Sequence, residues 1–121
     1  MDSNDRQKGA RMILVIGGTF QGKKEFAKEL AAEKKLRVVN FFHNQIQELL
    51  EAGENVDEYI RRFLEKNPRT VIVMDEVGAG VVPVERSDRE YREAIGLAGQ
   101  HLAREAEEVY RVVCGIGMRI K

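Results

Sequence analysis

The chain of 121 residues contains a single cysteine, two prolines and no tryptophan. With Cys114 alone, an internal disulfide is impossible, and a reducing, cytoplasmic location is expected. No apolar run approaches the length of a membrane span, so we expect no membrane partner. The polar stretch 1–10 lacks the apolar core of a signal peptide, and we expect a mobile tail there.

The chain also lacks an excess of charge of one sign. Its 20 lysines and arginines equal its 20 aspartates and glutamates, so the formal net charge is zero. Proteins that bind nucleic acid non-specifically usually carry a basic excess, so we expect no nucleic-acid partner. The length suits one domain with a modest core, which we place at residues 11–121.

Apolar runs of strand length alternate along the chain with segments in which apolar residues recur at helical spacing. The expected strands are 12–16, 36–42, 70–74, 109–114 and 118–120, and the expected helices are 22–34, 43–52, one capped by Asn55 or Asp57, and 88–106 capped by Ser87 or Asp88. This alternation predicts an α/β fold, with a mainly parallel sheet, helices on both faces and a short terminal antiparallel hairpin. Cys114, at the end of an apolar strand, is expected to be an inert core residue.

The stretch Met12–Glu25, MILVIGGTFQGKKE, places a glycine loop between a strand and a helix. Gly17, four intervening residues and then Gly22-Lys23 have the spacing of a phosphate-binding loop, whose backbone N–H groups and following helix N-terminus hold a phosphate. The predicted nucleotide-binding residues are Gly17, Gly18, Thr19, Phe20, Gln21, Gly22, Lys23 and Lys24. The motif requires Ser or Thr after the lysine to hold magnesium, and Lys24 stands there instead. The alternative is an ordinary glycine turn.

Polar residues follow two of the other expected strands. Asp75 and Glu76 come directly after the apolar run 70–74, where a carboxylate usually holds magnesium or orients a nucleophile. We therefore predict that Lys23, Asp75 and Glu76 are catalytic and that the two carboxylates are ligands of magnesium. The alternative is that the two carboxylates only cap a turn. Asn40 either bonds a ribose, base or metal, or only begins a turn.

Arg89 and Arg92 are three positions apart and share the face of an expected helix. Arginine pairs suit the recognition of phosphate or carboxylate, but on this segment alone a solvated face with local ion pairs is the better explanation. His43 and His101 have no metal-ligand neighbours at useful spacing. The chain therefore offers no cysteine and histidine set for a metal.

The second half of the chain resembles the bifunctional adenosylcobinamide kinase / adenosylcobinamide-phosphate guanylyltransferase family of cobalamin synthesis. The matching residues are Glu76-Val77-Gly78, Gly80, Val82-Pro83, Arg89, Tyr91-Arg92, Gly96, Gln100, Ala103, Glu108-Val109, Gly115-Ile116 and Lys121, together with Gly17-Gly18 and Gly22-Lys23 of the loop. The resemblance implies a P-loop NTPase-like fold, a homo-oligomer, and Mg²⁺ with ATP or GTP. It also implies transfer of the γ-phosphoryl group to a corrinoid hydroxyl, with Arg89, Arg92 and Gln100 on the acceptor side or at a subunit interface.

The departures from the family pattern affect its chemistry. Lys24 and Gln21 replace serines of the family's loop, Asn40 replaces an acidic residue, and Asp75 replaces an asparagine. The family's segment His-Arg-x-x-Arg-Pro, which bears the guanylylated histidine, has no counterpart, so we expect guanylyl transfer to be lost. Our leading hypothesis is a kinase. The alternatives are a catalytically decayed relative that binds a nucleotide or corrinoid to regulate a partner or hold an oligomer together, and a structural module with an empty loop.

Overall fold

A computed structural model describes residues 11–18, 20–40, 42–76 and 86–121 of the chain. Its strands are β1 (Arg11–Gly17), β2 (Arg37–Val39), β3 (Arg69–Asp75), β4 (Glu108–Val113) and β5 (Ile116–Arg119), and its helices are α2 (Lys23–Lys34), α3 (Phe42–Glu51), α4 (Val56–Lys66) and α5 (Arg86–Glu105). These strands form one sheet in the order β2-β3-β1-β4-β5, parallel except for β5. The predicted fold class, including the terminal antiparallel hairpin, is confirmed. The expected tail, Thr19 and the segment 77–85 lie outside the described residues.

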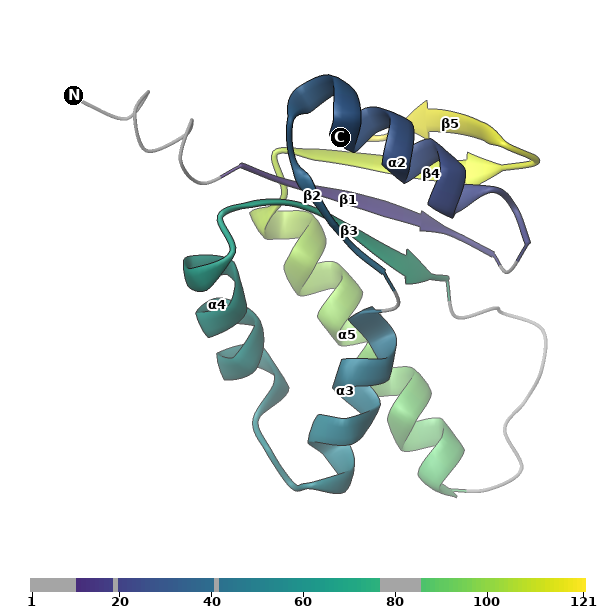
Figure 1. Cartoon of the computed structure of the whole chain (residues 1–121). Coiled ribbons are helices and arrows are strands. Elements are labelled where there is room, and N and C mark those ends of the chain that lie inside the picture. Colours follow the sequence, from purple (N-terminus) through teal and green to yellow (C-terminus); the bar gives the residue numbers. More distant parts are fainter. Residues whose placement is uncertain (1–10, 19, 41, 77–85) are drawn as a thin grey trace.

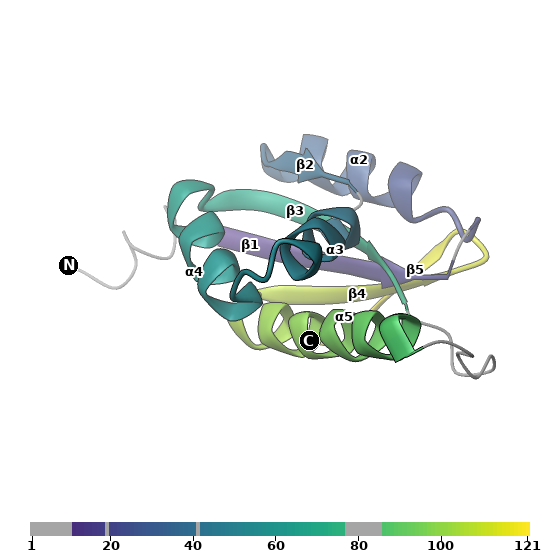
Figure 2. The same cartoon turned by 90° about the horizontal axis from the view of Figure 1, so that it is seen from below.

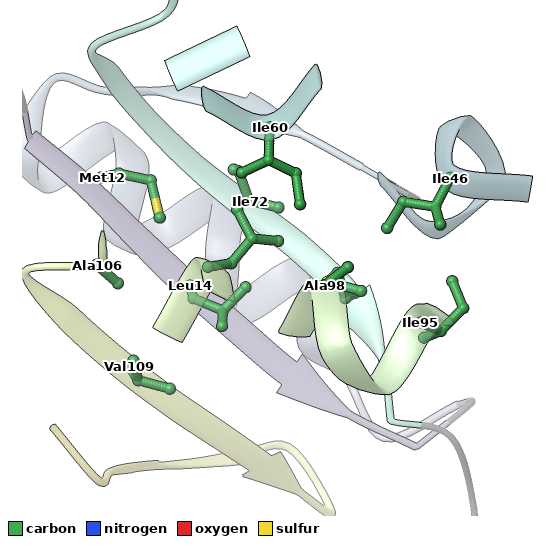
Figure 3. Close-up of a cluster of buried hydrophobic side chains, with 11 residues drawn as sticks. Met12, Leu14, Ile46, Ile60, Ile72, Ile95, Ala98, Ala106 and Val109 are labelled. Atoms are coloured by element: carbon green, nitrogen blue, oxygen red, sulfur yellow. The ribbon is translucent and has the colours of Figure 1, made fainter. Parts of the chain in front are cut away.

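Helices cover both faces of the sheet (Figures 1 and 2). On one face α2 buries Ala27 and Ala31 against the β1 and β3 side chains Val15 and Val73. On the other face α3, α4 and α5 enclose a larger cluster, which Figure 3 shows. Its fully or nearly buried members are Met12, Leu14, Ile46, Ile60, Ile72, Met74, Ile95, Ala98, Leu102, Ala106 and Val109. Because both faces are covered, the central strands are apolar at almost every position, as expected for a parallel sheet.

Two of the expected helix ends are confirmed. Asn55 caps α4, since its side chain accepts a 2.9 Å hydrogen bond from the backbone N–H of Glu58. Lys35 ends α2 in a left-handed conformation, with its N–H donating to the carbonyl of Ala31. Each end satisfies backbone groups that a helix leaves unpaired. None of the helices in the described ranges is long and apolar enough to cross a membrane.

Several expected element boundaries are wrong. The second strand stops at Val39, and Phe42 begins α3 instead of ending the strand. Among the described strands, β2 pairs with β3 alone and over three residues, so it is a short edge strand. Ser87 and Asp88 do not cap the last helix, because α5 already begins at Arg86 and both lie inside it.

The expectation for Cys114 is also wrong. Cys114 is exposed and lies outside β4, in a left-handed conformation with φ of 51°. The turn between β4 and β5 contains only Cys114 and Gly115, and β5 starts at Ile116, two residues earlier than expected. At the end of an apolar run, the sequence does not show which residue is the last in the strand and which is the first in the turn. The expected boundary was therefore one residue too late.

We predict that Asn55→Ala lowers the free energy of unfolding by about 1 kcal/mol, because the N–H of Glu58 loses its capping acceptor. Chemical denaturation of the variant and the wild type measures this difference. Gln47→Ala, which truncates an exposed polar side chain within α3, is the control and should leave the stability almost unchanged. An equal loss in both variants would contradict the capping role.

Candidate functional site

The carboxyl ends of β1, β3 and β4 meet where the loop 18–22 leaves the sheet (Figure 1). Gly17, the last residue of β1, pairs with Asp75 of β3 on one side and with Val112 of β4 on the other. Its carbonyl also accepts a 2.8 Å hydrogen bond from the N–H of Glu76. A Cβ atom at Gly17 would lie 2.7 Å from the carbonyl oxygen of Val112, so only glycine fits here. Gly17 therefore places the start of the loop directly between β3 and β4.

The loop turns sharply into α2. Gly22 precedes the helix with φ of 89°, a conformation that glycine adopts without a steric penalty. Phe20 also has a positive φ, 63°, and the residue is 98% exposed. Such a conformation is uncommon for a bulky residue, and backbone strain of this kind clusters at binding sites. Since Gly22 has no side chain, the positive end of α2 faces the loop without a side-chain cap.

Lys23 connects the loop to β3. Its side chain is nearly buried, with 8% of the residue exposed. The ammonium forms an ion pair with the carboxylate of Asp75 and donates a 3.1 Å hydrogen bond to the carbonyl of Gly18. A nearly buried ammonium requires such partners, because its desolvation is otherwise costly. The predicted catalytic residues Lys23 and Asp75 are therefore brought into direct contact.

A pocket of about 250 Å³ lies beside this ion pair. It is lined by Phe20, Gly22, Lys23, Lys24, Glu25, Asn40, Val73 and Asp75. Six of these were predicted from the sequence, whereas Glu25 and Val73 were missed. Gly17, Gly18 and Gln21 are in the loop or at its base but not among the lining residues, and Thr19 is outside the described residues.

Asn40 is placed at the pocket by the short strand β2, which ends one residue earlier. Among the buried side-chain polar atoms of the described residues, the Oδ1 atom of Asn40 is the one without a hydrogen-bond partner. Leaving a buried acceptor unsatisfied costs roughly 1–3 kcal/mol, so such an atom usually marks a place for a ligand or a water molecule. This observation favours the binding role of Asn40 over that of a simple turn residue.

Glu76 has a different environment from Asp75. Its carboxylate accepts two hydrogen bonds from the guanidinium of Arg111 on β4, at 2.7 Å to Nε and 3.2 Å to the terminal nitrogen. The hydrogen bond to Glu76, followed by the charge of its carboxylate, raises the pKa of Arg111. Glu76 is not among the pocket-lining residues. Its predicted metal or catalytic role stays a prediction, and in this arrangement the carboxylate links the residue that follows β3 to Arg111 on β4.

The residues expected on the acceptor side lie on α5. Arg89 and Gln100 are exposed, Arg92 is partly buried, and the pocket lining includes none of the three. Tyr91, on the same helix, is affected by the site: burial and then the negative charge of Asp75 raise the pKa of Tyr91. The sequence contained a signal for Tyr91 in the motif around Arg89 and Arg92, but its proximity to Asp75 became visible only in the fold.

The family described as cobinamide kinase / cobinamide phosphate guanyltransferase matches residues 37–120. The chain belongs to this family. It is 47% identical over 53 residues to the bifunctional adenosylcobalamin biosynthesis protein CobU of Salmonella typhimurium, and equally to that of Escherichia coli. The aligned segment is 44% of this chain but only 29% of each relative, so the chain matches less than a third of their length.

The match to the family includes part of the site and omits the rest. Asn40, Asp75, Glu76 and Tyr91 lie within the matched range, whereas the loop 17–24 precedes it. The loop is nevertheless joined to the matched part by β1, which pairs with both β3 and β4. The prediction that this loop binds phosphate therefore depends on the spacing of its glycines and lysine and on the geometry of the loop, not on the family match.

We predict that Asp75→Asn lowers the pKa of Tyr91 toward the ordinary value for tyrosine. The substitution removes the charge of Asp75, while burial, the larger cause, keeps part of the upward shift. NMR titration of the Tyr91 ring signals measures the change. Asp57→Asn, which removes a carboxylate next to His101, is the control. An unchanged Tyr91 titration in Asp75→Asn would show that Tyr91 is not near the site.

Proposed function

We propose that this chain is a nucleotide-binding phosphotransferase of the cobinamide kinase type, which transfers the γ-phosphoryl group of ATP or GTP to a corrinoid hydroxyl in cobalamin biosynthesis. The observation that carries the proposal is the ammonium of Lys23, held between Asp75 and the carbonyl of Gly18 beside a pocket at the start of α2. Membership of the family supports the substrate class. The loop spacing and the positive end of α2 support the binding of phosphate.

In this proposal, Lys23 exchanges its partners when a nucleotide binds. The backbone N–H groups of residues 17–23 hold the phosphates, and the ammonium moves from Asp75 to the β and γ oxygens. One anion replaces another beside the buried ammonium, so its charge remains balanced. The exchange also takes the ammonium of Lys23 away from the carboxylate of Asp75, which then orients the acceptor hydroxyl or helps to hold magnesium.

The residues at the pocket fit a magnesium ion that arrives with the nucleotide. Asp75 supplies a carboxylate and Asn40 an unpartnered amide oxygen, which are the hard oxygen ligands that Mg²⁺ prefers. The described residues contain no group of three His, Cys, Asp or Glu side chains that could hold a metal by themselves. Magnesium in proteins typically keeps several waters and phosphate oxygens as ligands, and it would neutralise charge on the phosphates.

The proposed reaction requires little covalent chemistry from the protein. The acceptor hydroxyl oxygen forms a bond to the γ-phosphorus while the bond from that phosphorus to the bridging oxygen breaks. The nucleoside diphosphate leaves with the bonding electrons, and the hydroxyl proton passes to Asp75 or to water. The protein contributes positioning, through the loop, and charge stabilisation, through Lys23. We propose that Arg89, Arg92 and Gln100 serve the acceptor side or an interface between subunits, and that guanylyl transfer is absent.

A second candidate function is a nucleotide-binding regulator without catalysis. It is favoured by Lys24, which provides no hydroxyl for magnesium, and by Glu76, whose carboxylate is held by Arg111. Such a protein would bind ATP or GTP without a dependence on magnesium. The kinase would bind them more tightly with magnesium than without it.

We predict that Lys23→Ala weakens the binding of ATP or GTP by roughly 10- to 100-fold, because a charge-assisted hydrogen bond to phosphate is lost. Isothermal titration calorimetry with and without magnesium measures this change. Lys28→Ala is the control, since it removes an exposed ammonium further along α2. If neither nucleotide binds the wild type at millimolar concentration, both candidate functions are wrong.

We predict that Lys24→Ser increases the dependence of nucleotide binding on magnesium, because it supplies the hydroxyl that a phosphate loop uses to hold the ion. The measured quantity is the ratio of the dissociation constants without and with magnesium, which should rise several-fold. Lys28→Ser makes the same change of residue away from the pocket and should leave the ratio unaltered. An unaltered ratio in Lys24→Ser would place the metal away from this position.

A further inference from the structure

The hairpin of β4 and β5 lies against the loop at the base of the pocket. Its turn, Cys114-Gly115, has φ of 51° and 77° and joins the paired residues Val113 and Ile116. Two consecutive positive φ values are typical of a two-residue type I′ turn. The N–H of Cys114 donates a 2.7 Å hydrogen bond to the Oε1 atom of Gln21. The N–H of Gly115 donates a second, also 2.7 Å, to the backbone carbonyl of Gln21.

Close packing accompanies these two hydrogen bonds. A Cβ atom at Gly22 would lie 3.1 Å from the Cα atom of Gly115, and a Cβ atom at Gly117 would lie 2.2 Å from the ring of Phe26. The hairpin therefore contacts both the loop and α2, as the arrangement of β4, β5 and α2 in Figures 1 and 2 illustrates. The close approach of Gly22 to Gly115 and the two hydrogen bonds to Gln21 hold the turn against the loop.

Gln21 occupies a distinctive position in the loop. It lies between Phe20 and Gly22, which both have positive φ values, 63° and 89°. Such conformations persist only where the surroundings determine them, and the contacts of Gln21 with the turn supply that support. The sequence predicted Gln21 as a nucleotide-binding residue. In the structure its side chain reaches Cys114 instead and does not line the pocket.

We propose that the Cys114-Gly115 turn holds the phosphate loop in its binding conformation, with Gln21 as the positioning residue that joins the two. This inference rests on the proposed binding of a nucleotide by the loop. Binding would stabilise the loop conformation and, through Gln21, the turn. Because such coupling is reciprocal, weakening the contact between turn and loop must also weaken the binding of the nucleotide.

The first measurement tests the effect of the turn on the loop. Gln21→Met keeps the length of the side chain but removes the oxygen that accepts from Cys114. We expect ATP or GTP to bind the variant roughly 3- to 10-fold more weakly in calorimetry, the effect of one coupled hydrogen bond. Gln45→Met is the matched control, since Gln45 on α3 likewise accepts a 3.1 Å hydrogen bond, from Tyr59 on α4. It should leave the affinity unchanged.

The second measurement tests the effect of the loop on the turn. Cys114 is the only cysteine of the chain and is exposed, so its reaction rate with dithiodipyridine reports on the turn. We expect saturating ATP or GTP to slow this reaction several-fold in the wild type and much less in Gln21→Met. This difference separates coupling through Gln21 from direct shielding of the thiol, which the substitution would not relieve.

The outcomes distinguish this inference from the proposed function. If neither nucleotide binds the wild type, both are wrong. If the wild type binds and Gln21→Met binds equally well, or if the thiol reaction is slowed equally in the two proteins, only the inference is overturned. Weaker binding by Gln21→Met, with loss of the effect on the thiol, supports it.

Discussion

The pairing of β1 with β3 on one side and β4 on the other is the constraint on which the site depends. It places Gly17 between Asp75 and Val112, so the loop leaves the sheet in contact with both neighbouring strands. The chain then turns into α2 at Gly22, which brings Lys23 back over the end of β3 and into contact with Asp75. The ion pair of the nearly buried Lys23 with the partly exposed Asp75 is thus a consequence of strand order and of the short distance between the end of β1 and the start of α2.

Most of the fold could be predicted from the sequence, because the signals for it are local. The apolar runs of β1 and β3, the periodicity of the helices and the cap at Asn55 all lie within a few neighbouring residues. The contacts that define the site could not, since they join distant parts of the chain. Glu76 and Arg111 are 35 positions apart, and Gln21 and Cys114 are 93 apart. The residue types at these positions give no indication of which partners the sheet will bring together.

The first turn of α2 indicates what the site is suited to bind. Lys23 and Lys24 stand at the positive end of the helix, where each cation is unfavourable by about 0.3–1 kcal/mol, and Glu25 offsets only part of this. A bound anion would reduce the repulsion, and its favourable interactions would offset the conformational cost of the positive φ at Phe20. A ligand that binds only the folded state also stabilises it, so these locally unfavourable features and the proposed phosphate binding are consistent with each other.

The charges at the pocket constrain how a nucleotide could be accommodated. Lys23 and Lys24 line it together with Asp75 and Glu25, so the formal charges of the lining side chains cancel. A nucleoside triphosphate carries several negative charges, which a neutral pocket does not balance by its side chains alone. The balance must come from the dipole of α2, the loop N–H groups and a cation that accompanies the phosphates. Asp75 and Asn40 offer two oxygen ligands at the pocket, so such a cation would take its other ligands from phosphate oxygens and water. Catalysis would then depend on whether Asp75, once separated from Lys23, can reach a metal ion held mainly by phosphate oxygens and water.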